Sequence, residues 1–291
     1  MAPVSFPDGA APVRAGTQTF WRDPSLAFVE ARQVVQARSL CYAPHTHEQF
    51  SFGAIDGGRA VYRNGGQRCV LHPGMLTLIN PGDVHACNPE EGQDWSFRML
   101  YVDAPWLHWL QAELGLGRPE SPHLLKATLS RDPVLYRGFD AMYRALVAET
   151  AEPLLRESAL VGFLGQVHAR VERIRRPATL DPAPMRQVAD YIHAHHARPL
   201  RLDELCAVAG LPAWQLIRAF RKVHGLTPHA YLLDCRFRRA RAALRQGVPI
   251  AEAAYRHGYA DQAHLQRCFK RAWAVTPGRY RAGGTQGESA R

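Results

Sequence analysis

The chain has 291 residues, of which 46% are hydrophobic, and its formal net charge is +10. This length predicts two domains, and no apolar run approaches the roughly 18 residues of a membrane span, which argues against an integral membrane protein. Residues 1–24 lack the features of a secretion signal and are expected to form a disordered leader, so we expect a cytoplasmic protein. The six scattered cysteines, without a CxxC pair, fit reduced thiols in that compartment.

The excess positive charge lies at one end of the chain. Residues 182–291 hold 18 Lys and Arg against 7 Asp and Glu, whereas the remainder holds 18 against 19. A uniform charge would indicate only solubility. This asymmetry instead predicts that the C-terminal part binds a polyanion.

Residues 25–175 are expected to form the first domain, which begins with strands. Runs such as FSFGAI, RAVYR and WSFRMLYV are rich in β-branched and aromatic residues, and hairpin-turn sequences at Asp56-Gly57-Gly58 and Asn64-Gly65-Gly66 separate them. Short strands at such spacing predict a sandwich or small barrel. The segments HTHEQFSFGAIDGG and HPGMLTLINPGDVHACN resemble the two cupin motifs, which implies a cupin-like β-barrel.

The interior of this expected barrel is a candidate pocket for a small organic effector, because small barrels can hold one ligand. Arg63 and Arg98, if they point inward, would favour a ligand with a carboxylate. The candidate lining residues are Tyr42, His45, His47, Phe52, Tyr62, His85, Trp95 and Arg98.

A divalent metal is the alternative occupant, because imidazoles from adjacent strands can converge. The candidate ligands are His45, His47 and His85. Cys87 or Glu48 could join them, but Ser51 and Phe52 stand where metal-binding cupins carry a Glu. The other interpretation is that the histidines hydrogen-bond a ligand or the chain, and on balance we expect no metal and no cofactor.

Residues after 103 are predicted to be helical, with a short segment at 105–114 and longer helices at 136–148 and 154–174. In the last helix, apolar residues spaced four, three, four and three apart form one stripe. The stripe consists of Leu160, Leu164, Val167, Val171 and Ile174. It predicts either a homodimer contact, which we favour, or packing on the chain's own barrel. Residues 176–184 are rich in Pro and are expected to form a linker.

Residues 185–283 contain one pattern twice, followed by a short tail at 284–291. Leu216 to Tyr231 recurs as Leu265 to Tyr280 at a constant spacing of 49 residues. Each copy predicts two helices around a Gly-containing turn, and Asp261 is expected to cap the second helix of the second copy. A helix-turn-helix pattern is a weak signal when it occurs once and a strong one when it occurs twice in register.

The second helix of each copy is predicted to bury an apolar stripe and expose a basic face, given about 100° per residue. The outward residues are Trp214, Gln215, Arg218, Arg221 and Lys222 in the first copy, and Gln262, Ala263, His264, Arg267, Lys270 and Arg271 in the second. Arg218 and Arg267 are the first candidates for base contacts, and residues nearer each C-terminus for phosphate contacts. A solvated charged surface is the alternative for any one of them.

The helix between the two copies is expected to begin at Thr227-Pro228, a cap followed by Pro in the first turn, and to end before Gly247. It should span about 28 Å, close to the ~34 Å repeat of B-DNA. One chain could therefore place two recognition helices in successive major grooves of double-stranded DNA.

The segments GLPAWQLIRAFRKVHGLTPHAYLLDCRFRRARAAL and GYADQAHLQRCFKRAWAVTPGRYR resemble the tandem helix-turn-helix domain of the AraC/XylS family of transcription regulators. Two positions depart from that family, with Pro212 and Ala263 where Ser is usual. The resemblance implies a ligand-responsive activator without catalytic activity, acting as a homodimer with RNA polymerase as a partner. The alternative is a cupin-type metalloenzyme or metal sensor fused to a DNA-binding domain.

Overall fold

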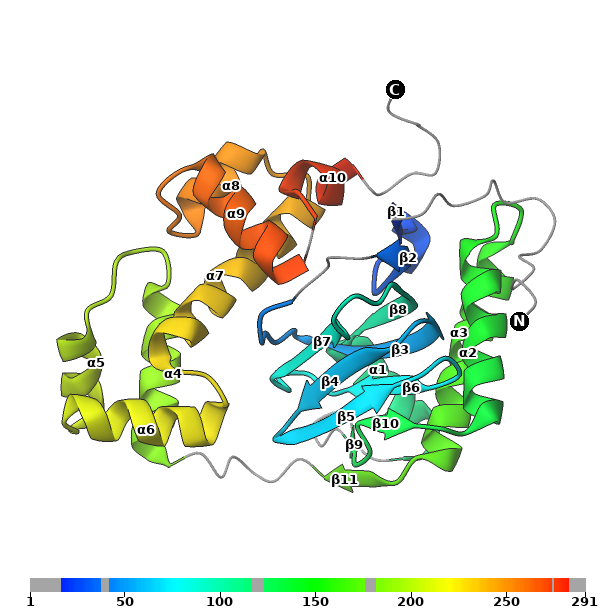
Figure 1. Cartoon of the computed structure of the whole chain (residues 1–291), viewed down its shortest axis with the longest axis horizontal. Helices are drawn as coiled ribbons and strands as arrows, with labels where there is room; N and C mark the ends of the chain where they lie inside the picture. The colour runs from blue at the N-terminus through cyan, green and yellow to red at the C-terminus, as the bar shows by residue number, and fades with distance from the viewer. Residues whose placement is uncertain (1–16, 38–41, 117–122, 176–181, 274, 283–291) are drawn as a thin grey trace.

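The computed structural model describes residues 17–37, 42–116, 123–175, 182–273 and 275–282. An N-terminal domain built mainly of strands is followed by a C-terminal domain built of helices, as the sequence predicted (Figure 1). The first helix of the second domain, α4, begins at Ala183, inside the linker predicted at 176–184. The expected tail at 284–291 lies outside the described residues.

Two antiparallel sheets form the N-terminal domain. The strand order of the larger sheet is β1 (Thr17–Trp21), β2 (Val29–Ala37), β8 (Trp95–Asp103), β3 (Gln49–Gly57), β6 (Leu76–Ile79) and β10 (Leu129–Ser130). The order of the smaller sheet is β5 (Gln67–Leu71), β4 (Ala60–Asn64) and β7 (His85–Pro89). The two sheets share a core in which Phe97 of the large sheet packs with Tyr62 of the small one. Two further strands, β9 (His123–Leu125) and β11 (Arg173–Arg175), pair with each other.

The described strands form an open sandwich, so the predicted β-rich domain is confirmed and the word barrel describes it only loosely. β1 and β10 are the two edges of the large sheet, and they do not pair with each other among the described residues. The expected disordered leader is also too long, because Thr17–Trp21 pairs with β2 along its whole length and Pro24–Leu26 forms a 3₁₀ turn (η1) capped by Asp23. Residues 1–16 of that leader lie outside the described part of the chain.

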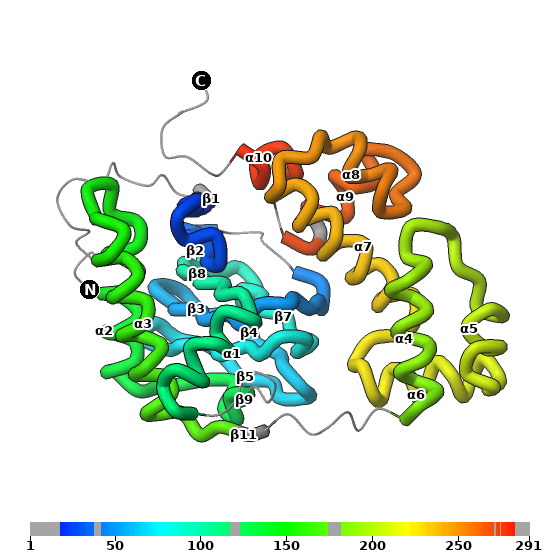
Figure 2. The backbone as a smooth tube through the Cα atoms, turned by 180° about the vertical axis from the view of Figure 1, so that it is seen from behind, coloured from blue at the N-terminus to red at the C-terminus, as the bar shows by residue number. Residues whose placement is uncertain are grey.

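Both faces of the large sheet are buried. Successive side chains of each strand point to opposite faces, so each strand contributes to both. Trp95, Phe97, Met99 and Tyr101 of β8 share the face toward the small sheet. The alternate residues of β8 pack toward three helices on the other face. These helices are α1 (Ala104–Glu113), α2 (Pro133–Val147) and α3 (Pro153–Arg170), of which α2 and α3 cover the side away from the C-terminal domain (Figure 2).

The apolar stripe predicted as a dimer contact belongs to the core of its own domain. Leu160, Leu164 and Val167 are fully buried, and Val171 is 7% exposed. They pack with residues of the large sheet and of α2 in one continuous cluster. The stripe is also not on one helix, because α3 ends at Arg170 and Ile174 lies in strand β11. A buried stripe offers no surface to a second chain, so this prediction is wrong.

The C-terminal domain consists of two helix-turn-helix units joined by one long helix. The domain begins with α4 (Ala183–His195), and the first unit is α5 (Leu202–Ala209) with α6 (Ala213–His224). The joining helix is α7 (Pro228–Arg245). The second unit is α8 (Ile250–Arg256) with α9 (Gln262–Trp273), and α10 (Pro277–Ala282) ends the domain. The predicted caps are confirmed, since Thr227 Oγ1 accepts from Ala230 N–H at 3.3 Å and Asp261 Oδ1 from His264 N–H at 2.6 Å.

Gly258 makes the turn of the second unit possible. Its φ is +76°, and a Cβ there would lie 2.7 Å from the carbonyl oxygen of Ala197. Only glycine adopts this conformation cheaply and permits this approach. The turn therefore also fixes the second unit against the loop that follows α4.

We predict that Leu164→Ala lowers the free energy of unfolding by about 2–5 kcal/mol, because it leaves a cavity in the core under the sheet. Leu154→Ala is the matched control on the same helix, since Leu154 is 75% exposed and its truncation should change stability by less than about 0.5 kcal/mol. Chemical denaturation measures both. Equal stabilities, with a change only in sedimentation, would restore the dimer interpretation.

Candidate functional sites

Helix α6 exposes the residues that the sequence assigned to DNA. Trp214 is 64% exposed, and Gln215, Arg218, Arg221 and Lys222 are exposed too. On the opposite side Leu216 and Phe220 are fully buried, as the periodicity predicted. Ile217, 36% exposed, lies beside this face and was not among the predicted outward residues.

Helix α9 repeats the arrangement with one difference. Gln262, Ala263, Arg267 and Lys270 are exposed. His264 is half-buried, and its ring packs against that of Tyr259 with 5.3 Å between centroids, so it belongs partly to the turn. The side chain of Arg271 lies outside the described part of the structure.

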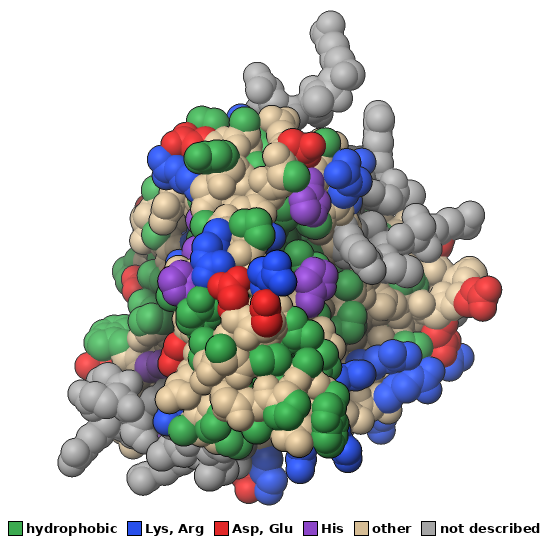
Figure 3. Space-filling model, turned by 90° about the vertical axis from the view of Figure 1, so that its left-hand side faces the viewer, with side chains coloured by type: hydrophobic (Ala, Val, Ile, Leu, Met, Phe, Trp, Pro, Cys, Tyr) green, Lys and Arg blue, Asp and Glu red, His purple; other side chains and the backbone are tan. Residues whose placement is uncertain are grey.

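The basic residues of the two recognition helices differ from several basic residues elsewhere in the domain. Arg198, Arg201 and Arg256 each pair with a carboxylate in their own unit. Within the described residues, no ion pair holds Arg218, Arg221, Lys222, Arg267 or Lys270. Figure 3 shows several groups of Lys and Arg side chains on the face that lies at the left of Figure 1. The cations of the recognition helices are thus free for phosphates and base edges.

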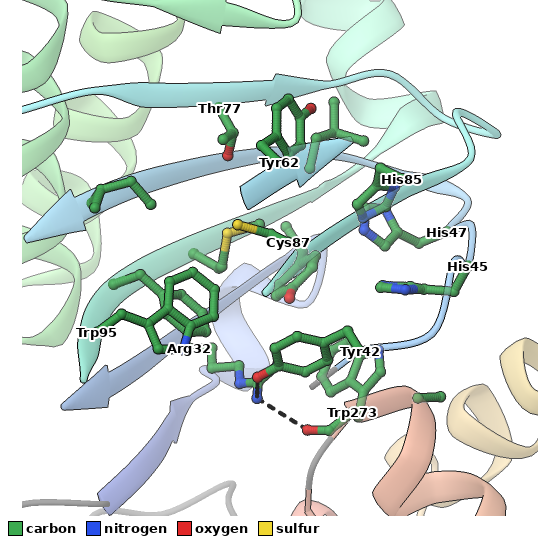
Figure 4. A pocket seen from close by; sticks show the side chains of 16 residues that line it. Arg32, Tyr42, His45, His47, Tyr62, Thr77, His85, Cys87, Trp95 and Trp273 are labelled. Carbon is green, nitrogen blue, oxygen red and sulfur yellow. Dashed lines mark hydrogen bonds between the residues drawn. The ribbon is translucent and has the colours of Figure 1, made fainter. Parts of the chain in front are cut away.

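A pocket lies between the two sheets of the N-terminal domain (Figure 4). Six of the eight predicted lining residues border it, and these are Tyr42, His45, His47, Tyr62, His85 and Trp95. The other walls are largely apolar, with Phe97, Met99 and Tyr101 among them. Its volume is about 50 Å³, enough for a few water molecules or an ion.

Phe52 and Arg98 are not part of this pocket, so that prediction is wrong for both. They lie on the helix-facing side of β3 and β8, where Phe52 packs against Phe163 of α3. The Arg98 guanidinium bonds both carboxylate oxygens of Asp56, at 2.7 and 2.8 Å, and Asp140 of α2 at 2.7 Å. Strand alternation alone left the direction open, and this ion pair shows that Arg98 joins sheet to helix. Arg63, the other candidate for a carboxylate, is exposed.

Among the lining residues that the sequence did not suggest, Arg32 adds a buried cation and Trp273 an aromatic wall. Arg32 of β2 is 3% exposed, and its guanidinium donates to Gln18, to the Tyr42 hydroxyl at 2.9 Å and to the Trp273 carbonyl at 3.0 Å. Trp273 is the last residue of α9, and only 1% of it is exposed. Its ring stacks on Tyr101 at 5.3 Å and on Phe20 at 6.0 Å. A recognition helix thus supplies one wall of a pocket in the other domain.

The joining helix α7 makes a second, polar contact between the domains. Asp234 accepts from the Thr46 backbone N–H at 3.0 Å, and Arg238 pairs with Glu48 at 2.6 Å. One turn further along, Arg241 donates to the side chain of Gln49. All three N-terminal partners lie beside the pocket histidines in sequence. This polar contact, defined by Asp234, Arg238, Arg241 and Arg245 of α7, is called the α7 interface below.

Burial keeps the three pocket histidines uncharged. It lowers the pKa of His45 to about 4 and that of His85 to about 3. The pKa of His47 is lowered well below its ordinary value, first by burial and then by the two neighbouring imidazoles. At neutral pH the pocket therefore presents neutral imidazoles and one buried guanidinium.

Comparison with known proteins agrees with this architecture. Residues 30–164 match the family model of the AraC-like ligand binding domain, and residues 205–283 match a helix-turn-helix domain. The uncharacterized regulator YbfI of Bacillus subtilis is 26% identical over 86% of this chain and 90% of its own length. The arabinose operon regulatory protein of Escherichia coli is 26% identical over 78% of each chain.

Solved structures share the two-domain arrangement. Apo ToxT from Vibrio cholerae superposes with a TM-score of 0.57 over 94% of this chain and 100% of its own, at 14% identity. In the described part of the chain, none of the helices has the length and apolar character needed to cross a bilayer. The chain belongs to the AraC family of transcription regulators, with an N-terminal ligand-binding domain and a C-terminal domain that binds DNA.

Proposed function

We propose that this regulator is an activator rather than an enzyme, and that an effector in the pocket controls how its DNA-binding domain is presented. The observation that carries the proposal is the position of Trp273. This residue ends recognition helix α9 and also forms a wall of the N-terminal pocket. Any molecule that fills the pocket must touch the DNA-binding domain directly.

The lining indicates the chemical class of the effector. The walls are mostly aromatic and aliphatic, which favours an apolar body. Two buried donors, Trp95 Nε1–H and Arg32 Nε–H, have no acceptor among the described residues. Because a buried donor without a partner costs free energy, a ligand that supplies an acceptor would gain by binding there. We therefore propose a small, largely apolar effector with a carboxylate or similar acceptor group.

The volume of the pocket indicates how an effector would act on the DNA-binding domain. The pocket holds about 50 Å³, whereas sites for organic ligands hold about 300–1,000 Å³. An effector of that size fits only if a wall moves, and Trp273 is the wall that belongs to another domain. Effector binding would then favour states in which α9 has left the N-terminal domain, a shift in population rather than a new fold.

The DNA-binding mode follows from α7. Its 18 residues span about 27 Å, and α6 and α9 lie near its two ends (Figure 1). We propose that α6 and α9 enter successive major grooves, with Arg218 and Arg267 on base edges and the other exposed cations on phosphates. From the family, we further propose a cytoplasmic homodimer that contacts RNA polymerase. Its dimer contact must lie outside the buried stripe of α3.

Arg218→Ala and Arg267→Ala should each weaken binding to the cognate site by about 1–3 kcal/mol and relax the base preference at one position. Arg256→Ala is the control, since it removes an exposed cation from α8 of the same domain. Binding measured on a library of single-base variants separates the two roles. A loss of affinity that is equal on every sequence would make these arginines phosphate contacts.

The fragment 182–291 should bind DNA alone, and its affinity should fall steeply with salt because it contains the entire charge excess. Gel shifts at several salt concentrations measure this. A folded fragment that forms no complex at low salt would contradict the assignment of this domain.

Arg238→Ala tests the coupling, because it removes the ion pair of α7 with Glu48. If the docked arrangement restrains the recognition helices, DNA affinity without effector should rise about 3- to 10-fold. Arg239→Ala is the matched control, one position along the helix and exposed to solvent. Affinity that is unchanged, or lowered equally in both variants, would show that docking does not control DNA binding.

A further inference from the structure

Three imidazoles meet at one end of the pocket (Figure 4). The ring centroids of His47 and His85 are 4.5 Å apart, those of His45 and His85 4.6 Å, and those of His45 and His47 5.8 Å. One nitrogen from each ring lies within 4.8 Å of the other two. In the described residues this is the one group of three or more His, Cys, Asp or Glu side chains arranged in this way.

The backbone fixes which nitrogen of each ring carries the proton. Nδ1 of His45 lies 2.8 Å from the Ala43 carbonyl, and Nδ1 of His85 lies 2.9 Å from the Asp83 carbonyl. Nδ1 of His47 is 3.4 Å from the Gln49 carbonyl and 3.1 Å from Ser51 Oγ. A carbonyl can only accept, so Nδ1 of His45 and of His85 donates and Nε2 of each keeps a lone pair. For His47 the Gln49 carbonyl favours the same tautomer, in which the Ser51 hydroxyl accepts.

The arrangement therefore brings one nitrogen of each ring together, and in His45 and His85 Nε2 keeps a lone pair. Each ring is neutral because burial disfavours its charged form. Among the described residues, no donor is bonded to any of the three Nε2 atoms. Imidazoles held by carbonyls at Nδ1 with Nε2 free are the usual state of histidines that bind metals.

The strands hold the three rings in place before any ion arrives. His45 and His85 form a bridge in which each backbone N–H donates to the other's carbonyl at 3.1 Å. The carbonyl of His47 accepts from Gly82 N–H at 2.9 Å, which ties it to the turn before His85. Little ordering cost remains for a ligand that bridges the rings.

We propose that Nε2 of His45, His47 and His85 bind a divalent first-row transition metal ion, whose remaining coordination positions face the pocket. Neutral imidazoles suit zinc, iron, copper or nickel rather than magnesium or calcium, which prefer oxygen ligands. Ligands of one tetrahedral zinc lie about 3.4 Å apart, so small ring rotations complete the site. The missing Glu was the reason to expect no metal from the sequence. Three protein ligands with an open position are nevertheless a complete set for zinc.

Some charged groups around the site favour a bound cation and others disfavour it. The guanidiniums of Arg241 and Arg32 disfavour a cation near His45, whereas the Asp234 carboxylate favours one near His85. Arg32 is held by the Tyr42 hydroxyl and the Trp273 carbonyl, and Arg241 lies over the Trp273 ring at 4.5 Å. Both guanidiniums thus already have partners outside the histidine cluster. Metal binding at this cluster is a property beyond the proposed regulation by an effector.

The test is titration of the full, untagged chain, stripped of metal with a chelator, in the absence of DNA and effector. Zinc added in a calorimeter should bind at one equivalent per chain, and cobalt should give the visible ligand-field absorption of a nitrogen-bound ion. The His47→Ala, His85→Ala double variant should lose more than about 100-fold in zinc affinity. Ser51→Ala, which removes only the hydroxyl partner of His47, should lose roughly 10-fold.

Two controls separate this site from adventitious binding. His229→Ala removes an exposed histidine of α7, and Cys235→Ser removes the thiol that lies 3.4 Å from His193 Nδ1. Both should bind zinc as the parent chain does. Failure of the parent chain to bind, or one equivalent that persists in the double variant, overturns the proposal. If circular dichroism shows the double variant unfolded, the Ser51→Ala titration decides, and an unchanged affinity there overturns it.

Discussion

The arrangement of the whole molecule depends on the burial of Trp273 in a domain to which it does not belong. Its ring is enclosed by Tyr101 and Phe20, and its carbonyl is held by the buried Arg32. A large aromatic side chain with these partners is a strong anchor, since aromatic pairs add to the free energy of apolar burial. Tyr280 of α10 adds to this contact, since its ring packs edge-on against Phe20 and its hydroxyl donates to Glu30 at 3.1 Å. The α7 interface supplies further polar side chains between the domains.

Features that depend on local pattern were predictable from the sequence. The repeat located both helix-turn-helix units, and period 3.6 placed Leu216 and Phe220 inside and Arg218 outside, as observed. The pocket was found through its histidines and aromatics, most of which do line it. These predictions succeeded because one helix or one strand pair decides each of them.

Features that depend on long-range packing were not predictable in the same way. Arg98 and Phe52 have the composition of pocket residues, but strand direction turns them toward α2 and α3, and no local signal gives that direction. The stripe from Leu160 to Val171 fits a helix pair equally well whether the partner is another chain or its own sheet. Trp273 was not predicted to be a site residue, because only the docking of two distant domains brings it to the pocket wall.

The α7 interface repeats at positions 234, 238, 241 and 245, the spacing of a helical seam, yet its members are charged rather than apolar. A charged seam is weakened by ions in solution, as are the contacts of a protein with phosphates. Rising ionic strength would therefore loosen the domains and loosen the complex with DNA at the same time. Loosening the domains makes the recognition helices available to DNA, whereas weakening the phosphate contacts favours dissociation from DNA. The two effects oppose each other, so the DNA affinity of the intact chain should fall less steeply with cellular potassium than that of its DNA-binding part alone.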